Sequence, residues 1–351
     1  MRKRLQNRGA RVSVAEVAAA AQVSTATVSR VLNKADYVKP ETRRAVEEAI
    51  ATLGYIPHGA ARSLSSRSSR IIGAVIPSID NSIFAAGVEA LQAHLNDRGY
   101  HLLIGSSNYD PEEEHQVVRS FLEQRAAGII MMGETHTRDC LAVLARHGTP
   151  FVNTGVYSPE QPYHCVGFDN AGVATKAVRY LLQLGHRHFA MIAGITADND
   201  RAIGRVRGVR AELARAGLTL PDDRVLERRY DIAESRAAFR DLMSLPEPPT
   251  AIICGNDVQG FGAILEAQHS GIRIPEQVSV VGFDDLVLSR HLKPSLTTIR
   301  VPTQEMWCRA ADMLLARLSG EKTPRAVEIE TSLIVRESTG PVPASLAAAG
   351  L

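Results

Sequence analysis

A group of residues near the start of the chain has the types and spacing needed to contact DNA bases. Residues 13–33, SVAEVAAAAQVSTATVSRVLN, fit two short helices joined by a tight turn, which can present the second helix to a major groove. On that helix Ala26 could touch a thymine methyl group, Thr25 could hydrogen-bond a base edge, and Arg30 could reach guanine O6 and N7. The alternative is an ordinary helical hairpin whose polar side faces solvent.

Three short helices are expected to position these residues. Ser13 and the glutamate three residues later form a capping box, which starts a helix at residue 14. Ser24 is the N-cap of a second helix that runs through Leu32. Pro40 suits the first turn of a third helix, and Gly54 ends it. The periodic apolar residues that should pack between these helices are Val14, Val17, Ala18, Ala21, Val28, Val31, Leu32, Val46, Ala49, Ile50 and Leu53.

Basic charge is concentrated in this part of the chain. Residues 1–70 hold 13 Lys and Arg against 5 Asp and Glu, a net charge of +8; since the whole chain carries +2, the other 281 residues carry −6. A basic N-terminal segment joined to a mildly acidic remainder suggests that the N-terminal segment binds a polyanion. Residues 57–70, PHGAARSLSSRSSR, have the composition of a linker, although Pro57 could open a short helix that forms only against a partner.

From Ile71 onward, short apolar runs alternate with amphipathic helices. This βαβ pattern predicts parallel sheets covered on both faces, and its length exceeds one hydrophobic core, so we expect two lobes. The expected fold is an all-α helix-turn-helix domain joined to a two-lobed α/β domain. The expected strands are IIGAVIP, HLLIGS, AGIIMM, TPFVN, HFAMIAG, TAIICG and VSVVGF, and the expected helices are 83–98, 111–124, 170–184, 203–216, 232–243 and 257–270.

Several classes of protein are disfavoured. Four widely spaced cysteines form no C-x-x-C pair, which fits a reducing cytoplasm rather than a disulfide framework or a zinc site. No apolar run reaches 18 residues, and polar residues interrupt the run after the basic N-terminus, so we expect neither a membrane span nor an export signal. No P-loop, G-x-G-x-x-G or G-x-S-x-G motif occurs, so we expect no catalytic residues, cofactor or metal. The histidines of GHRH, residues 185–188, are more often structural than metal-binding.

Eight blocks between residues 14 and 300 point to one family. They are A-E-V-A-x-x-A-x-V-S-x-x-T-V-S-R-V-L-N, V-K-P-E-T-R-x-x-V-x-x-A-I, L-G-Y-I-P, A-A-R-S-L, L-G-H-R-H-F-A, G-N-D, V-S-V-V-G-F-D-D and P-S-L-T-T-I. In this order they resemble the lactose-repressor/galactose-repressor family of transcriptional regulators. The resemblance implies a sensor domain similar to periplasmic sugar-binding proteins. It also implies a set of DNA-contacting residues in the first helices, namely Thr25, Ala26 and Arg30 on bases, Ser29 and Asn33 near phosphates, and Ser13, Ser24 and Thr27 beside them.

The resemblance extends to the linker. It places Ala61, Arg62 and Leu64 in a hinge helix that enters the minor groove, where the leucine would wedge into a base step and kink the duplex. Gly59 departs from the usual residue and weakens helix propensity by about 1 kcal/mol, so hinge folding should depend on DNA. Reading a palindromic operator needs two copies, and the tail GPVPASLAAAGL is too short for a tetramerising coiled coil. We therefore expect a homodimer.

Effectors of this family bind between the two lobes. Phe84, Arg205, Asn256 and Asp284 match family positions that contact the effector, and Asn153 ends a strand that faces the same cleft. Arg, Asn and Asp side chains beside an aromatic wall suit a polyhydroxylated or anionic ligand. Without the resemblance, Arg205 could be a solvated helix charge, Asn256 a helix cap and Asp284 a turn residue.

Position 231 bears on the kind of effector. Where some relatives have an aromatic residue, this chain has Asp231 beside Tyr230, and its only tryptophan, Trp307, is expected in the core on a late helix. A more polar pocket favours a sugar or sugar acid over a flat purine. The expected function is therefore a repressor controlled by such a metabolite. A sensor of a purine or nucleoside is the alternative, and a solute-binding protein is disfavoured because it would need export and no DNA-binding head.

The expected boundaries combine these observations. Double-stranded DNA and a small molecule are the expected partners, and the cytoplasm the expected location. Lobe 1 should comprise about 71–168 with 299–329, and lobe 2 about 169–298 with 330–340. The expected domains are a DNA-binding domain over 1–56, a hinge over 57–70, a sensor over 71–340 and a flexible tail over 341–351.

Overall fold

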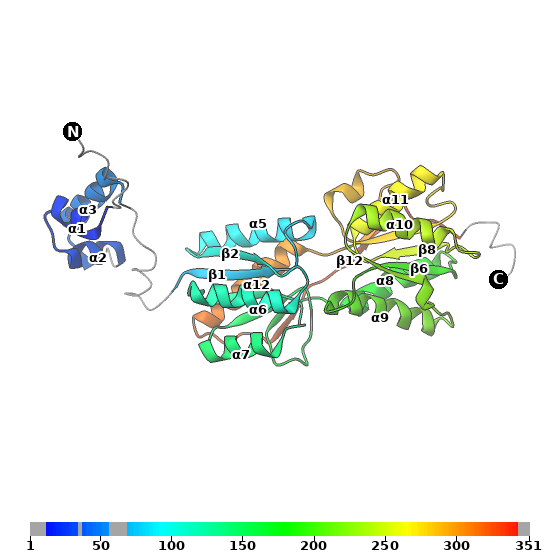
Figure 1. The fold of residues 1–351 in the computed structure, drawn as a ribbon, viewed down its shortest axis with the longest axis horizontal. Helices are drawn as coiled ribbons and strands as arrows, with labels where there is room; N and C mark the ends of the chain where they lie inside the picture. The colour runs from blue at the N-terminus through cyan, green and yellow to red at the C-terminus, as the bar shows by residue number, and fades with distance from the viewer. Residues whose placement is uncertain (1–11, 34–36, 56–68, 343–351) are drawn as a thin grey trace, which may run out of the picture. The chain divides into compact units, whose positions relative to one another are not determined.

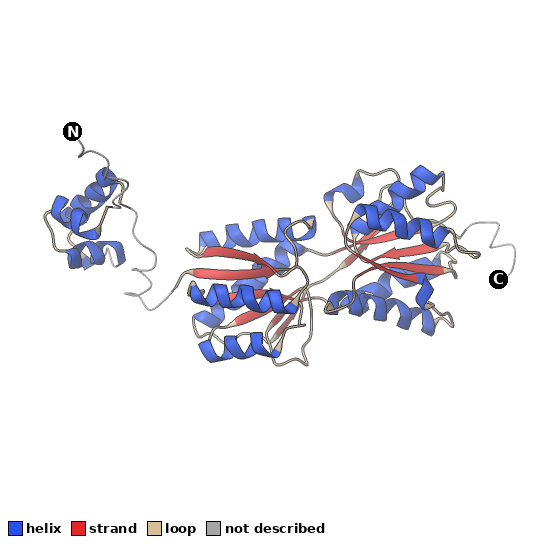
Figure 2. Ribbon diagram, in the orientation of Figure 1, coloured by secondary structure: helices blue, strands red, loops and turns tan. Residues whose placement is uncertain are grey.

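The chain divides into two compact units, Met1–Ser69 and Arg70–Leu351 (Figure 1). The computed structural model describes residues 12–33, 37–55 and 69–342. Over these ranges the small unit is helical, and the large unit contains two sheets with helices on both faces (Figure 2). The expected combination of a helical domain with a two-lobed α/β domain is confirmed. No helix in the described ranges is both long and apolar enough to cross a membrane.

The small unit consists of three helices over its described residues. They are α1 (Val14–Ala20), α2 (Thr25–Asn33) and α3 (Pro40–Leu53). The predicted capping box is present, since the Ser13 side chain accepts from the Glu16 backbone N–H and the Glu16 carboxylate accepts from the Ser13 N–H at 2.6 Å. The Ser24 hydroxyl accepts from the Thr27 N–H at 3.1 Å at the start of α2. Gly54, in the left-handed region at φ 62°, ends α3 as expected.

The apolar residues predicted for the first three helices do pack together. Val17, Val28 and Val46, one from each helix, have no exposed surface, and Ala18, Val31 and Ala49 complete the buried group. The remaining predicted residues are partly buried around it, namely Val14, Ala21, Leu32, Ile50 and Leu53. The polar faces of α1 and α2 are left exposed, which makes them available to a partner.

Lobe 1 of the large unit has a six-stranded sheet whose neighbouring strands are all parallel. Two helices, α5 (Ser82–Asp97) and α12 (Thr303–Leu318), cover one face of it. The other face is covered by α6 (Pro111–Glu123) and α7 (Arg138–His147) (Figure 2). From edge to edge the strands are β11 (Ala326–Glu328), β5 (Cys165–Gly167), β4 (Phe151–Thr154), β3 (Gly128–Met132), β1 (Ile71–Ile76) and β2 (His101–Ser106).

Lobe 2 repeats this plan with a second six-stranded sheet. Its helices pair as α8 (Asn170–Gln183) with α9 (Asp200–Arg215), and α10 (Ile232–Met243) with α11 (Asp257–Ser270), with one pair on each face. Two 3₁₀ helices, η2 (Asp222–Arg224) and η3 (Val287–Arg290), lie in the connections. From edge to edge the strands are β12 (Ser332–Ile334), β10 (Thr297–Arg300), β9 (Ser279–Asp284), β8 (Ala251–Cys254), β6 (Phe189–Gly194) and β7 (Val225–Arg228).

The predicted strands and helices all exist, but the sequence missed several short elements. Strands β5, β7, β10, β11 and β12 have only three or four residues each, which is too short for a periodic signal. Helix α7 was also absent from the expected set, whereas α12 is the late helix that was expected to carry Trp307. The expectation of purely parallel sheets fails at one edge, because β12 pairs antiparallel with β10.

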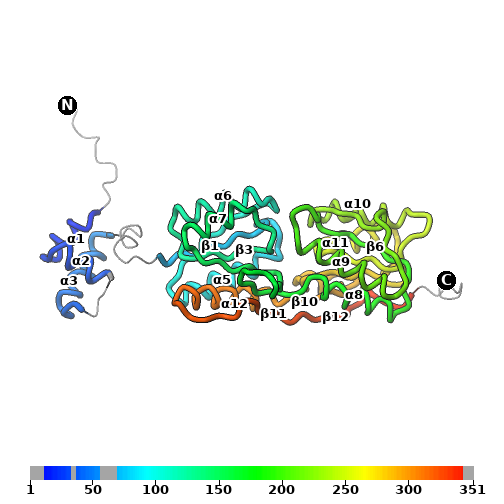
Figure 3. Tube along the Cα trace, turned by 90° about the horizontal axis from the view of Figure 1, so that it is seen from below, coloured from blue at the N-terminus to red at the C-terminus, as the bar shows by residue number. Residues whose placement is uncertain are grey.

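The chain passes between the lobes three times in the described large unit. It crosses after β5, again between β10 and α12, and finally between β11 and β12, and Figure 3 shows these late segments running along both lobes. All four residues of β10 pair with β9. The lobe boundary expected at 298/299 therefore falls inside a lobe 2 strand, and the crossover comes after Arg300.

Candidate DNA-binding surface and effector cleft

The exposed face of α2 has the side chains expected to read bases. Thr25, Ala26 and Arg30 are exposed, whereas Thr27 and Ser29 are partly buried. Asn33 is the last residue of the helix. The side of α2 that carries Val28 and Val31 packs on the other two helices. The arginine, the threonine hydroxyl and the alanine methyl group thus remain free to enter a groove.

The two serines that begin these helices have local partners. The Ser13 hydroxyl donates to the Glu16 carboxylate at 2.8 Å, and this contact occupies its only proton. The Ser24 hydroxyl lies 2.9 Å from the Thr27 hydroxyl. These contacts cap the helices, so the Ser13 hydroxyl could donate to a phosphate only by giving up its bond to Glu16. The expected hinge residues Ala61, Arg62 and Leu64 lie outside the described residues.

A cavity between the two lobes brings together three of the residues expected to bind the effector. Phe84 reaches it from α5, Arg205 from α9 and Asp284 from the end of β9. Tyr109, Phe168, Tyr230 and Trp307 complete its aromatic lining. Its volume is about 50 Å³, room for a few waters and too little for a sugar. A sugar-sized ligand therefore requires the lining side chains or the lobes themselves to move apart.

Arg205 is held in the cleft by several contacts within lobe 2. Its Nε donates to the Asn170 side-chain oxygen at 3.1 Å, and its Nη1 donates to the Gly255 carbonyl. Its guanidinium carbon lies 4.5 Å from the centre of the Phe283 ring. The residue is only 8% exposed. The alternative of a solvated helix charge is therefore excluded for Arg205, although it holds for the exposed Arg207.

Asp284 and Asn256 each have a buried polar atom with no hydrogen-bond partner among the described residues. The atoms are Oδ2 of Asp284 and Nδ2 of Asn256. Burial raises the pKa of Asp284 to about 6, while the charge of Arg205 acts in the opposite direction. Asn256 also caps α11, because its Oδ1 accepts from the Gln259 N–H at 2.9 Å. An unpaired buried polar group costs about 1–3 kcal/mol, so Oδ2 of Asp284, which lines the cavity, would gain from a polar ligand. Asn256 does not line the cavity, and its helix-capping role is the alternative that the sequence offered.

Asn256 is one of three residues expected in the effector site that do not line the cavity, and the other two are Asn153 and Asp231. Asn153 is buried at the end of β4, with its Oδ1 3.2 Å from His136 Nε2, and the other ring nitrogen of that histidine lies 2.6 Å from Glu114. Asp231 is exposed and caps α10 by accepting from the Glu234 N–H at 2.8 Å. Neither lines the cavity. The side chains of Asn153 and Asp231 therefore bind groups of the protein itself rather than facing the cavity.

The structure adds three cleft residues that sequence reasoning did not select. The rings of Tyr109, from lobe 1, and Tyr230, from lobe 2, lie 6.0 Å apart. Arg201 lines the cavity and pairs with Asp200 at 2.9 Å. The two tyrosines could have been identified from their positions in the sequence. Tyr109 and Tyr230 both follow the carboxyl end of a parallel strand, where α/β proteins bind ligands.

Asp200 also joins the two lobes directly. Its carboxylate accepts from the backbone N–H of Glu134, in the segment after β3 of lobe 1. The neighbouring Gly133 has φ 84°, and a Cβ there would lie 2.0 Å from Arg201 Nη1. The arginine end could move away, so it is the positive φ that favours a glycine here. The protein's own groups thus connect the lobes beside the cavity.

The GHRH histidine has a structural role, as expected. His186 is fully buried; its Nδ1 lies 3.0 Å from the Thr250 hydroxyl and its Nε2 3.0 Å from the Gly340 carbonyl. The part of the chain that the structure describes contains no group of three or more His, Cys, Asp or Glu that could hold a metal ion.

Comparison with known proteins agrees with this architecture. A model described as bacterial regulatory proteins, lacI family, matches residues 13–58, and one described as a periplasmic binding protein-like domain matches residues 178–339. The HTH-type transcriptional repressor CytR of Escherichia coli (strain K12) is 30% identical over 329 residues, which cover 93% of this chain and 96% of CytR. The chain belongs to the lacI family. This regulator thus combines the two domain types that the sequence predicted.

Other relatives of this lacI-family regulator are similar over nearly the whole chain. The HTH-type transcriptional repressor PurR of Escherichia coli O139:H28 (strain E24377A / ETEC) is 32% identical over 335 residues, 94% of this chain and 98% of PurR. The lac repressor dimer bound to operator and the anti-inducer ONPF has a TM-score of 0.85 at 28% identity, covering 94% of this chain and 99% of that one. A transcriptional regulator CelR–cellobiose complex has a TM-score of 0.69 at 31% identity, covering 93% and 100%.

Proposed function

We propose that this regulator is a cytoplasmic transcriptional repressor, without catalytic activity, whose affinity for a palindromic operator is controlled by a small sugar or sugar acid bound between the lobes. The observation that supports this most directly is the cleft itself. Arg205 is buried there beside Asp284, whose Oδ2 has no partner in the described part of the chain, and aromatic rings face both. A sugar offers hydroxyl groups to the carboxylate and guanidinium, and apolar C–H faces to the rings.

The homodimer is supported by the exposed apolar surface of the large unit. Val287 and Leu288 are adjacent on η3 and are 73% and 46% exposed. Ile79, which follows β1, is 72% exposed. Exposed apolar side chains mark an interface where they form a contiguous patch, as the adjacent Val287 and Leu288 begin to do, whereas single ones are common on monomers. The lac repressor structure that this chain resembles is a dimer on its operator, and two copies would place two α2 helices about one DNA turn apart.

A nucleoside or purine is the second candidate effector. The observation in its favour is the pair of Tyr109 and Tyr230 rings that line the cavity from the two lobes, since a flat base could stack on an aromatic side chain. The sugar is preferred because Arg201, Arg205 and Asp284 give the lobe 2 side of the cavity a charged lining. A cellobiose complex among the similar structures supports the same class.

The effector class can be tested by thermal unfolding of the full-length protein. Neutral hexoses, aldonic and uronic acids, nucleosides and free purines would each be added in turn. A compound at 100 times its Kd adds about 2.7 kcal/mol to the free energy of unfolding. A shift with a sugar or sugar acid that also changes operator affinity in a gel-shift assay supports the proposal. A shift with nucleosides or purines alone would contradict the effector class while leaving the repressor assignment intact.

Base reading can be tested at Arg30, on the exposed face of α2. Arg30→Ala should weaken binding to the cognate operator by about 1–3 kcal/mol and barely affect binding to random DNA, because a bidentate guanine contact is sequence-specific. The measurement is the Kd for both DNAs at one fixed salt concentration. Equal losses on the two would show that Arg30 contacts only phosphate.

A further inference from the structure

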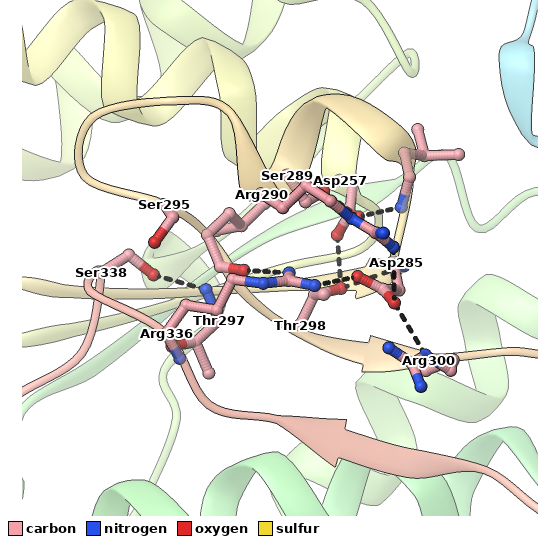
Figure 4. A network of polar contacts seen from close by, with 12 residues as sticks. Asp257, Asp285, Ser289, Arg290, Ser295, Thr297, Thr298, Arg300, Arg336 and Ser338 are labelled. Atoms are coloured by element: carbon pink, nitrogen blue, oxygen red, sulfur yellow. Dashed lines mark hydrogen bonds and ion pairs between the residues drawn. The ribbon is translucent and has the colours of Figure 1, made fainter.

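Asp285 is the centre of a cluster of ion pairs beside the effector cleft. Its side chain is only 3% exposed and contacts three arginines. Arg336 Nη2 donates to its Oδ1, Arg300 Nε lies 2.7 Å from its Oδ2, and Arg290 Nη2 lies 3.7 Å from the same oxygen. Figure 4 shows Arg300 and Arg336 reaching the carboxylate from different sides. We call Asp285 with these three arginines the Asp285 cluster.

The residue before this cluster has no side-chain bond to hold it. Asp284 Oδ2 is buried and without a partner in the described ranges, and no hydrogen bond is formed by the rest of its carboxylate there. Its orientation must therefore come from the backbone. That backbone is unusual, because Asp284 and Asp285 both have positive φ, 107° and 56°. Two successive non-glycine residues in this region are strained and persist only where neighbouring contacts hold them.

Those holding contacts come from Asp285 and from the residue after it. The backbone N–H of Asp285 points to the Thr298 hydroxyl at 3.4 Å. The N–H of Leu286 donates to the Asp257 carboxylate at 2.8 Å, and that carboxylate also accepts from the Thr298 hydroxyl. Burial raises the pKa of Asp257 to about 8. The turn is thus fixed on the side away from the cavity, and only the Asp284 carboxylate is left to face it.

We propose that the Asp285 cluster positions the Asp284 carboxylate for the effector, so that Asp285 is a positioning residue of the ligand site. This inference rests on the proposed function of the cleft. The cluster holds the strained turn in the one conformation that keeps Asp284 beside Arg205. Without it, the turn relaxes and the carboxylate moves toward solvent.

The same contacts tie the turn to the connections between the lobes. Arg300 is the last residue of β10, and the next residue, Val301, lines the cavity on the way to α12. Arg336 follows β12, the strand that begins after the last crossover, and its Nη1 also donates to the Leu296 carbonyl at 2.7 Å. Movement of the lobes at either connection would therefore displace an arginine that binds Asp285, and with it the turn that positions Asp284.

The test is the titration of Asp284 in the full-length protein, which needs no effector. Selective ¹³C labelling of aspartate carboxyl groups, with Asp284→Asn to assign the signal, gives its pKa by NMR. In the wild type the value should be about 6. In Asp285→Asn it should fall toward the usual aspartate value of 3.8, because the released carboxyl regains water. An unchanged value would overturn the proposal.

The arginine variants distinguish a purely electrostatic effect of the cluster on the pKa of Asp284 from a positioning effect. Removing Asp285 leaves uncompensated arginines, which would also lower the pKa of Asp284. Removing an arginine has the opposite electrostatic effect and would raise it. Positioning instead predicts a lower pKa in Arg336→Gln and in Arg300→Gln, with the larger drop for Arg336, whose contacts are more numerous. A raised or unchanged value in both would overturn the proposal even if Asp285→Asn behaves as expected.

Two further measurements keep the result interpretable. Asp241→Asn is the matched control, since it removes an exposed ion pair with Arg228 at 3.5 Å in the same lobe without touching the cluster, and Asp284 should titrate as in the wild type. Arg300 is 49% exposed, so Arg300→Gln provides a folded variant if Asp285→Asn does not fold. Operator binding by the wild type tests the repressor assignment separately. The repressor assignment and the positioning role of Asp285 would therefore be contradicted by different experiments.

Discussion

The two walls of the effector cleft are built from different chemistry. Lobe 1 contributes mainly apolar groups, among them Phe84, Met306 and Trp307. Lobe 2 contributes the charged groups Arg201, Arg205 and Asp284. An apolar wall favours any apolar ligand surface without regard to direction, whereas buried charges need partners at defined positions. Under the proposed function, lobe 1 would supply area for binding, while lobe 2 would decide which ligand fits and in which orientation.

The largest expected effect comes from removing the central cation of the lobe 2 wall. Arg205→Met should lower the free energy of unfolding by about 3–5 kcal/mol, because two hydrogen bonds from a buried charged donor are lost and Asp284 loses its countercharge. Urea denaturation measures this. Arg207→Met, an exposed arginine on the same helix, is the control and should stay within about 0.5 kcal/mol of wild type. Similar losses in both would mean that Arg205 is no more important than a surface charge.

Asp284, in the lobe 2 wall, should also contribute to the pH dependence of stability. Asp284 has a pKa of about 6 in the folded protein against a usual 3.8, so the folded state holds its proton more tightly than the unfolded state. Its contribution to stability is therefore fully present below pH 3.8 and is lost as the pH rises to about 6. A pKa difference of this size between the folded and unfolded states corresponds to about 3 kcal/mol of stability.

Denaturation at a series of pH values can check this expectation. Between about pH 4 and pH 6 the wild type should lose stability more steeply than Asp284→Asn, which cannot ionise at this position. If both proteins show the same slope, the burial of this carboxylate does not govern the pH response and the two walls differ less than we infer.

The lobe 1 wall should respond to changes of shape rather than charge. A Cβ on Gly87 of α5 would lie 2.4 Å from Cδ1 of Trp307, which is fully buried. Gly87→Ala should therefore cost about 1–3 kcal/mol of stability through overpacking. Trp307→Phe provides the matched background, since a smaller ring relieves the clash, and the cost of Gly87→Ala should shrink there. A cost that is independent of the ring would place the strain elsewhere.

The smallest expected effect concerns the contact that joins the walls. Asp200→Ala removes the hydrogen bond from the Glu134 N–H and the ion pair with Arg201. It should cost about 1 kcal/mol, the usual net value of a hydrogen bond. Because this bond bridges the lobes, the radius of gyration from small-angle X-ray scattering should also rise. Asp231→Ala, which removes an exposed helix cap within lobe 2, should leave that radius unchanged.

Much of the local structure could be predicted because its causes are local. The capping box at Ser13, the stop at Gly54 and the long apolar strands depend on residues a few positions apart. The short strands could not be predicted in this way. β11 and β12 have only three residues each, and they form strands because they hydrogen-bond to the neighbouring strands of the sheets. For the site, Phe84, Arg205 and Asp284 were selected by resemblance and meet at the cavity, whereas Asn153 and Asp231 have partners that sequence proximity does not reveal.

The sequence by itself determined that this chain has a three-helix DNA-binding head and a two-lobed α/β sensor, since periodicity, caps and family motifs are properties of neighbouring residues. Only the tertiary structure decided which side chains meet across the lobes. Tyr109 and Tyr230 are separated by 121 residues in the numbering, yet their rings lie 6.0 Å apart. Asp285 acquires Arg300 and Arg336 as partners because β9, β10 and β12 lie side by side in one sheet. The order of the strands in the sheet creates these contacts with Asp285, and no local sequence pattern predicts that order.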